Sequence, residues 1–141
     1  MDAAPMATDP LREWHRIATT QDAAALPALL ADAVVFHSPV VHTPQVGRSI
    51  AATYLGAALG VFGNDSFRYV REFRGERSAV LEFEVEIDGI HVNGVDMLAW
   101  DDAGRIVEFK VMLRPLKALN VIQQKMGAIL AARGGQAAPL R

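Results

Sequence analysis

Hydrophobic and polar residues alternate one by one between Ser78 and Ile87, which is the repeat of a β-strand with one buried face. Three similar runs lie beside it, and the segments between them are short and rich in turn residues, such as Asp88-Gly89 and the sequence DDAG at 101–104. Short turns join antiparallel neighbours, so the pattern predicts four consecutive antiparallel strands. We expect these strands at residues 67–73, 78–87, 92–100 and 106–113.

Before residue 63 the hydrophobic positions recur every three to four residues, as in amphipathic helices. Asp9 followed by Pro10 is typical of a helix N-terminus, with the aspartate as cap. Near the end of the chain another apolar face repeats at helical spacing. The pattern predicts a first helix from Pro10, further helices at 23–30, 48–62 and 115–132, a short strand at 34–36, and a loop at 40–47.

Helices packed on one strongly curved antiparallel sheet, with an added C-terminal helix, form an α+β fold. The strand at 92–100 is largely apolar on both faces, so something must cover its second face. A second copy of the sheet in a two-fold homodimer is the simplest cover, and the C-terminal helix lying across that face is the alternative. We expect the homodimer, with residues 10–132 as a single domain between a flexible arm at 1–9 and a flexible tail at 133–141.

Composition narrows the function classes. The 141 residues suit one domain, and the formal net charge of −2 gives no electrostatic footprint for nucleic acid. The chain has no cysteine, which excludes disulfides and thiolate chemistry. The four histidines lack metal-ligand spacing, so no metal is expected. Since no signal-peptide pattern and no run of about 20 apolar residues is found, we expect a cytoplasmic protein without a membrane partner.

Asp96 is an acid inside the apolar run GVDMLAW at 94–100. Burial of an ionised carboxylate without a partner costs several kcal/mol, so Asp96 must be paired, outward-facing, protonated or reserved for a ligand. If the loop at DDAG has an even number of residues, Asp96 lies opposite Phe109 and on the same face as Val107, in an apolar concavity. A three-residue loop allows a surface ion pair with Lys110 instead. The first register is favoured because it turns the apolar set of every strand inward.

Three segments together resemble a known family: LLADAVVFHSPV at 29–40, VGRSI at 46–50 and VDMLAWDDAGRIVE at 95–108. Their order and spacing are similar to those of the NTF2-like superfamily, in its SnoaL-like and ketosteroid-isomerase-like branch, over about residues 8–114. The resemblance implies a cone-shaped α+β barrel with a deep apolar pocket, and we expect no cofactor. It also implies dimerisation through the outer face of the sheet.

The resemblance places Asp96 where the isomerase has a protonated aspartic acid that donates a hydrogen bond to the developing enolate. Trp14 stands at the place of a tyrosine that shares this role, and its indole N–H is a different donor. Ser38, before Pro39, replaces the aspartate that serves as general base. A serine cannot carry a proton between two carbons near neutral pH without a neighbouring base, so steroid isomerisation by the usual route is not expected.

Other branches use the same acid differently. Polyketide-cyclase-like relatives use a pocket aspartate as acid/base, sometimes with a histidine nearby, here His37 or His42. Epoxide-hydrolase-like relatives need an Asp–Arg–Asp arrangement with a water-holding tyrosine, for which only Asp96 and Tyr54 are candidates.

The sequence therefore predicts a protein that binds an apolar carbonyl- or ring-containing ligand through Asp96. If it is an enzyme, which the sequence leaves open, it is a cofactor-independent isomerase, cyclase, hydratase or hydrolase with Asp96 as acid/base or hydrogen-bond donor. The alternative is a non-catalytic dimerisation or ligand-binding module whose cone is filled by its own side chains. A ligand site would need a cavity of about 300 Å³ or more around Asp96. The expected lining residues are Trp14, Ser38, Val40, Tyr54, Phe83, Leu98, Trp100 and Phe109.

Overall fold

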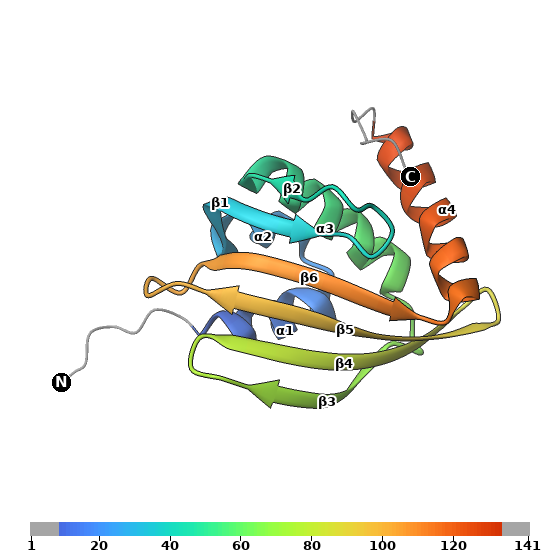
Figure 1. The fold of residues 1–141 in the computed structure, drawn as a ribbon, viewed down its shortest axis with the longest axis horizontal. Helices are drawn as coiled ribbons and strands as arrows, with labels where there is room; N and C mark the ends of the chain where they lie inside the picture. The colour runs from blue at the N-terminus through green and yellow to red at the C-terminus, as the bar shows by residue number, and fades with distance from the viewer. Residues whose placement is uncertain (1–8, 134–141) are drawn as a thin grey trace.

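A computed structural model describes residues 9–133, so the expected arm at 1–9 and tail at 133–141 lie almost wholly outside the described residues. Four α-helices pack on a curled, open sheet of six strands in the order β2-β1-β6-β5-β4-β3 (Figure 1). The elements are α1 (Pro10–Thr20), a 3₁₀ turn (Ala23–Ala25), α2 (Leu26–Leu29), β1 (Leu30–His37), β2 (Gln45–Val46), α3 (Arg48–Phe62), β3 (Arg68–Arg74), β4 (Ser78–Ile87), β5 (Ile90–Trp100), β6 (Ile106–Arg114) and α4 (Leu116–Ala132).

The four antiparallel strands β3 to β6 confirm the predicted run of neighbours. Asp88 and Gly89 form the two-residue turn between β4 and β5, with φ of 53° and 78°. Positive φ at both central residues is what a tight hairpin turn requires. The pairing of Ile87 with Ile90 fixes the register of the whole hairpin, and the apolar residues of β4 turn inward as predicted.

The sheet is mixed rather than wholly antiparallel, because β1 pairs parallel with β6. The alternation of residues within a strand fixes its faces but gives no direction for neighbours that are distant in sequence. Residues 40–47, expected as a loop, include the short strand β2, which pairs with β1. The expected helix at 23–30 is shorter than predicted: Asp22 makes no capping hydrogen bond, and its carboxylate accepts one from Arg16 instead.

The N-terminal helices lie on the concave side of the sheet, where α1 buries Leu11, Trp14 and Ile17 (Figure 1). The side chain of Asp9 accepts a hydrogen bond from the backbone N–H of Leu11, which confirms the predicted cap. Helix α4 packs against α3 at one end of the sheet and does not lie across its outer face (Figure 1). The alternative cover for the outer face is therefore wrong for the described part of the chain.

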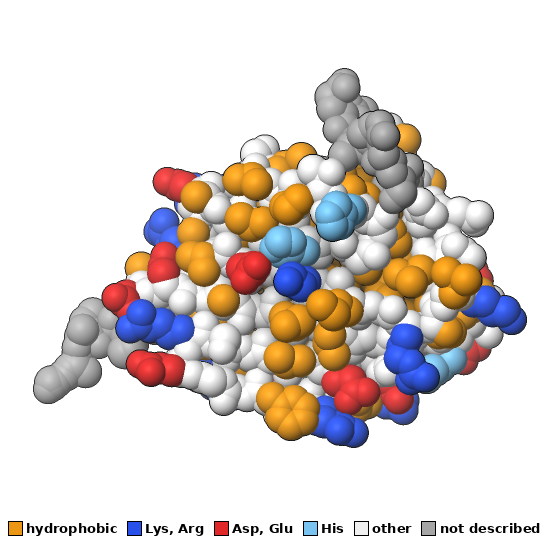
Figure 2. All heavy atoms as spheres, in the orientation of Figure 1, with side chains coloured by type: hydrophobic (Ala, Val, Ile, Leu, Met, Phe, Trp, Pro, Cys, Tyr) orange, Lys and Arg blue, Asp and Glu red, His pale blue; other side chains and the backbone are white. Residues whose placement is uncertain are grey.

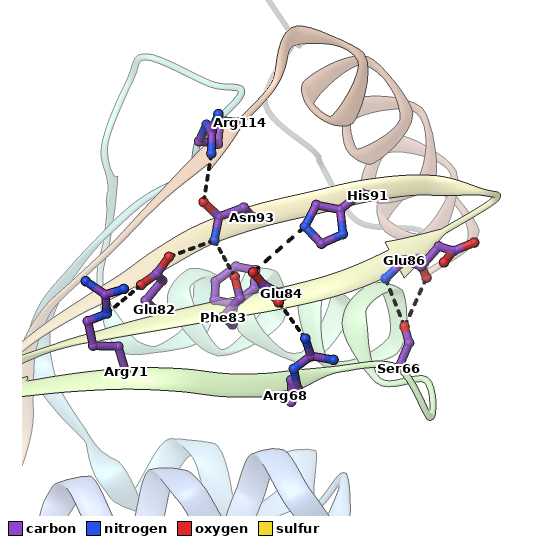
Figure 3. Close-up of polar contacts among 10 residues, drawn as sticks. All are labelled: Ser66, Arg68, Arg71, Glu82, Phe83, Glu84, Glu86, His91, Asn93 and Arg114. Carbon is purple, nitrogen blue, oxygen red and sulfur yellow. Dashed lines mark hydrogen bonds and ion pairs between the residues drawn. The ribbon is translucent and has the colours of Figure 1, made fainter.

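The outer face of the sheet carries both charged and apolar side chains. Glu82 forms an ion pair with Arg71 and accepts a hydrogen bond from Asn93, and Glu84 pairs with Arg68, so these two acids are tied to basic side chains at the surface (Figure 3). Hydrophobic side chains gather over the middle of the same face (Figure 2). The exposed fraction of Met112 there is 52%.

Candidate functional site

Asp96 lies on the inner face of β5 with an exposed fraction of only 6%. The prediction that Asp96 faces inward is right, but its predicted cross-strand partner is wrong: Asp96 pairs with Val111, and Phe109 pairs with Leu98. The loop after β5 is longer than expected, and a β-bulge between Ala99 and Trp100 adds one more residue. The two changes keep the acid inside and shift its partner by two positions.

Val107 is the residue displaced by that bulge. It was expected on the inner face, but it is left out of the register and 36% exposed, while Ile106 takes the buried place. The alternative ion pair also does not form, because Lys110 lies opposite Met97 on the other face of the sheet.

A chain of two hydrogen bonds runs from helix α1 to Asp96. The indole N–H of Trp14 donates to the hydroxyl oxygen of Tyr69 at 2.9 Å, and this hydroxyl donates to Oδ2 of Asp96 at 2.5 Å. Trp14 is therefore a donor, as its chemistry suggested, but its N–H is engaged by Tyr69. Within residues 9–133 the other carboxylate oxygen, Oδ1, has no hydrogen-bond partner.

Burial raises the pKa of Asp96 from 3.8 to about 7, although the hydrogen bond from Tyr69 acts in the opposite direction by stabilising the carboxylate. Burial also raises the pKa of Tyr69 well above its ordinary value, and the neighbouring charge of Asp96 raises it further. Tyr69 is thus held in its protonated, donating form. Asp96 can gain or lose a proton near neutral pH, as a group used for proton transfer should.

Among the described residues, Asp96 and Tyr69 are the only ionisable ones that line a cavity of about 50 Å³ between the sheet and helices α1 and α3. This volume is far below the 300 Å³ expected for a ligand site, because aromatic side chains fill much of the cone. A second hollow of about 320 Å³ lies toward solvent and shares Ala18, Gln21, Gly63, Phe67 and Tyr69 with the cavity. The remaining cavity residues are Trp14, Leu55, Ala58, Leu59, Phe62, Phe83, Phe109 and Val111.

The structure brings four of the sequence-predicted site residues together at this cavity: Asp96, Trp14, Phe83 and Phe109. Trp14 and Phe109 meet edge to face, with ring centroids 4.8 Å apart. Ser38, Val40, Tyr54, Leu98 and Trp100 do not line it.

Those five residues have other surroundings. Ser38 Oγ accepts a hydrogen bond from the backbone N–H of Val40 in a half-buried loop. The ring of Tyr54 packs against Phe36 in the core, and Trp100 lies beneath the guanidinium of Arg74. Leu98 is a buried core residue.

Tyr69, which binds Asp96, is the most important of the cavity residues that sequence reasoning missed. The apolar alternation of Phe67 and Tyr69 at the start of β3 was a usable signal, but it does not continue through the strand. A β-bulge between Tyr69 and Arg71 sets Val70 and Arg71 together opposite Glu82. The inner face therefore changes from odd to even positions in mid-strand.

Within residues 9–133 no group of three or more histidine, aspartate or glutamate side chains could hold a metal ion. In the same part of the chain, no helix has both the length and the apolar character needed to cross a bilayer.

Comparison with known proteins now decides the family, since the model for the SnoaL-like domain matches residues 11–109. This chain belongs to the SnoaL-like domain family. Crystal structures of other NTF2-like proteins are similar to the chain as well, so its fold is NTF2-like. None of the curated proteins is significantly similar to it.

One similar structure is that of a steroid delta-isomerase from Pseudomonas aeruginosa, which is 37% identical, with a TM-score of 0.84 over 93% of this chain and 98% of that one. A protein from Silicibacter pomeroyi with a cystatin-like fold is 27% identical, with a TM-score of 0.81 over 89% of each chain. A candidate SnoaL-like polyketide cyclase from Shewanella denitrificans is 16% identical, with a TM-score of 0.63 over 86% of this chain and 99% of that one. The last likeness shows the fold of the SnoaL-like domain alone.

Proposed function

We propose that this protein binds a small apolar compound with a ring and a carbonyl group, and that Asp96 meets the polar atom of that ligand. The observation that carries this proposal is the free Oδ1 of a carboxyl group that is 6% exposed and borders an apolar cavity. A buried polar atom without a partner is costly, and a ligand that hydrogen-bonds to it removes that cost.

The chemistry that fits is proton transfer without a cofactor, as in an isomerase, cyclase or hydratase. A carboxyl group with a pKa of about 7 can donate a hydrogen bond to a carbonyl oxygen when protonated and can accept a proton from carbon or water when ionised. The name of the steroid delta-isomerase that is 37% identical supports carbonyl chemistry. Ser38 lies outside the cavity, so it does not supply a second acid/base group there.

Binding can be tested with cyclic unsaturated ketones of increasing size, from 2-cyclohexenone to 4-androstene-3,17-dione, by titration calorimetry at pH 6 and pH 8. We expect at least one of these probes to bind the protein, and Asp96→Asn to weaken that binding about tenfold or more, the equivalent of one hydrogen bond to a buried acid. Asp102→Asn is the matched control, because Asp102 pairs with Arg77 at the surface. Equal affinity in the Asp96→Asn and Asp102→Asn variants would contradict the role of Asp96.

A non-catalytic module with a filled cone is the second candidate, and the cavity volume of about 50 Å³ favours it. For a larger ligand to enter, side chains at the boundary between the cavity and the outer hollow must move. Failure of every probe to bind the wild-type protein would support the module.

We also propose that the outer face of the sheet pairs with a second copy of this chain. Met112, Val107 and Val46 are large hydrophobic side chains with exposed fractions of 52%, 36% and 65%, and contiguous apolar area of this kind is uncommon on monomers. Val95 and Met97 are half-buried residues of β5 on the same face, where Val95 pairs with Met112 and Met97 with Lys110. A two-fold axis through the middle of the face would cover all of it.

Sedimentation velocity at micromolar concentration tests this homodimer. The wild-type protein is expected to sediment with twice the mass of the chain, and Met112→Lys to sediment as a monomer because it places a charge at the centre of the interface. A Val70→Lys variant serves as control, since Val70 is 41% exposed on the edge strand β3. A wild-type monomer would refute the proposal.

A further inference from the structure

Tyr69 reaches Asp96 from β3, which is the edge strand of the sheet. Its ring enters the cone because the bulge after Tyr69 changes which residues of β3 face inward. Before the bulge, Phe67 and Tyr69 face the cavity. After the bulge, Glu72 and Arg74 face α1, where Glu72 pairs with His15 and Arg74 pairs with Asp9. The bulge thus separates an apolar cavity-lining half of β3 from a polar half that fastens the strand to α1.

Three ring contacts hold Tyr69 in this position. Phe67, Phe83 and the ring of His15 pack edge to face against it, with centroid distances of 5.0, 6.2 and 5.2 Å. The hydroxyl group then has both its roles filled, because it accepts from Trp14 and donates to Asp96. It has no second proton to offer a ligand.

We infer that Tyr69 is a positioning residue which, held by Trp14, fixes one oxygen of Asp96 and leaves only Oδ1 to meet the ligand. This inference rests on the proposed function for its purpose, but its geometry stands without a ligand. The acid is thereby presented in one orientation, through one oxygen. The hydrogen bond from Trp14 polarises the tyrosine hydroxyl and strengthens its donation to the carboxylate.

The groups around Asp96 limit what else could control its proton. Leu81 on β4 and Val111 on β6 are its cross-strand neighbours, and Leu55 and Leu59 line the cavity from α3. From α1 comes Trp14, which is uncharged. His15, also on α1, is a further titratable group at this place: it touches the ring of Tyr69 and pairs with Glu72 at 3.0 Å.

The test is a pH titration of the carboxyl carbon resonance of Asp96 by nuclear magnetic resonance in ¹³C-labelled protein without ligand, with the resonance assigned through Asp96→Asn. In the wild-type protein we expect a midpoint near pH 7. Tyr69→Phe removes the donor that stabilises the carboxylate, so its midpoint is expected to rise by about one pH unit or more. Trp14→Phe keeps the tyrosine, so it is expected to raise the Asp96 midpoint by less than Tyr69→Phe does.

Two control variants separate positioning from a general effect of substitution. Tyr54→Phe removes the other tyrosine hydroxyl, outside the cavity, and His91→Gln removes an exposed histidine ring that pairs with Glu84 on the outer face of β5. Both variants are expected to leave the Asp96 midpoint within a few tenths of a pH unit of the wild-type value. The inference is overturned if Tyr69→Phe leaves the midpoint unchanged, or if Tyr54→Phe raises it equally.

The same titration separates this inference from the proposed function. A shifted midpoint in Tyr69→Phe, together with no binding of any cyclic ketone to the wild-type protein, would support the hydrogen-bond chain and reject the ligand site. The indole N–H resonance of Trp14 provides an independent measurement. It is expected to follow the Asp96 titration in the wild-type protein and to lose that pH dependence in Tyr69→Phe.

Discussion

Asp96→Asn is expected to change the free energy of unfolding in a pH-dependent way. Its effect on this free energy should be about 4 kcal/mol more favourable at pH 8 than at pH 4. In the folded protein the pKa of Asp96 is about 7, against an ordinary value of 3.8, so the folded state holds its proton more tightly than the unfolded state does. The stabilisation from this proton is complete below pH 3.8 and is lost as the pH rises to about 7. Asparagine is neutral throughout and escapes that loss.

Urea unfolding of the wild-type protein and Asp96→Asn at several pH values between 4 and 8 measures this difference. The gap in free energy of unfolding should widen steadily between pH 4 and pH 7 and stay constant above. Asp102→Asn, at the surface, should show no such trend. A gap independent of pH would mean that Asp96 is not a buried acid with a raised pKa, and the proton chemistry proposed for it would lose its basis.

Gly94→Ala is expected to destabilise the protein by about 3 kcal/mol, near the upper end for an overpacked interior. A β-carbon at Gly94 would lie 2.6 Å from Cδ2 of Leu113, 2.6 Å from the carbonyl oxygen of Met112 and 2.7 Å from Cζ of Phe83. The side chains could turn away, but the carbonyl oxygen belongs to the paired strand β6. Relief of the contact with Phe83 would also displace a ring that lines the cavity.

Thermal and urea unfolding of Gly94→Ala can be compared with Gly60→Ala. Gly60 lies in the interior of α3, and its added β-carbon would come no closer than 3.9 Å, to Ile129. Alanine there is expected to stabilise the helix by up to about 1 kcal/mol. Similar effects of the two substitutions would show that close packing at Gly94 does not constrain the curled sheet.

Most of the framework could be predicted from the sequence because it depends on local alternation. The turn at Asp88-Gly89 and the clean alternation of β4 fix their own register, and that register turns Asp96 inward. Helix α1 could be placed from Asp9 and Pro10 together with its apolar stripe. Each of these predictions depends on neighbours within a few residues along the chain.

The errors arose where one extra residue or a distant partner decides the geometry. The bulge that pushes Val107 outward and the one after Tyr69 each shift a strand by one residue, and no turn residue marks either position. The parallel pairing of β1 with β6 joins segments separated by about half of the chain. The site was therefore predicted only as far as its acid and three of its aromatic neighbours, and the hydroxyl group that binds the acid was missed.

As the edge strand of the sheet, β3 pairs with only one other strand among the described residues, β4. Substitutions along the outer side of β3 can therefore alter how far Tyr69 extends into the cone without disturbing the rest of the sheet. Natural variation in this exposed strand could in this way change the pKa of Asp96, while the other residues that line the cavity stay the same.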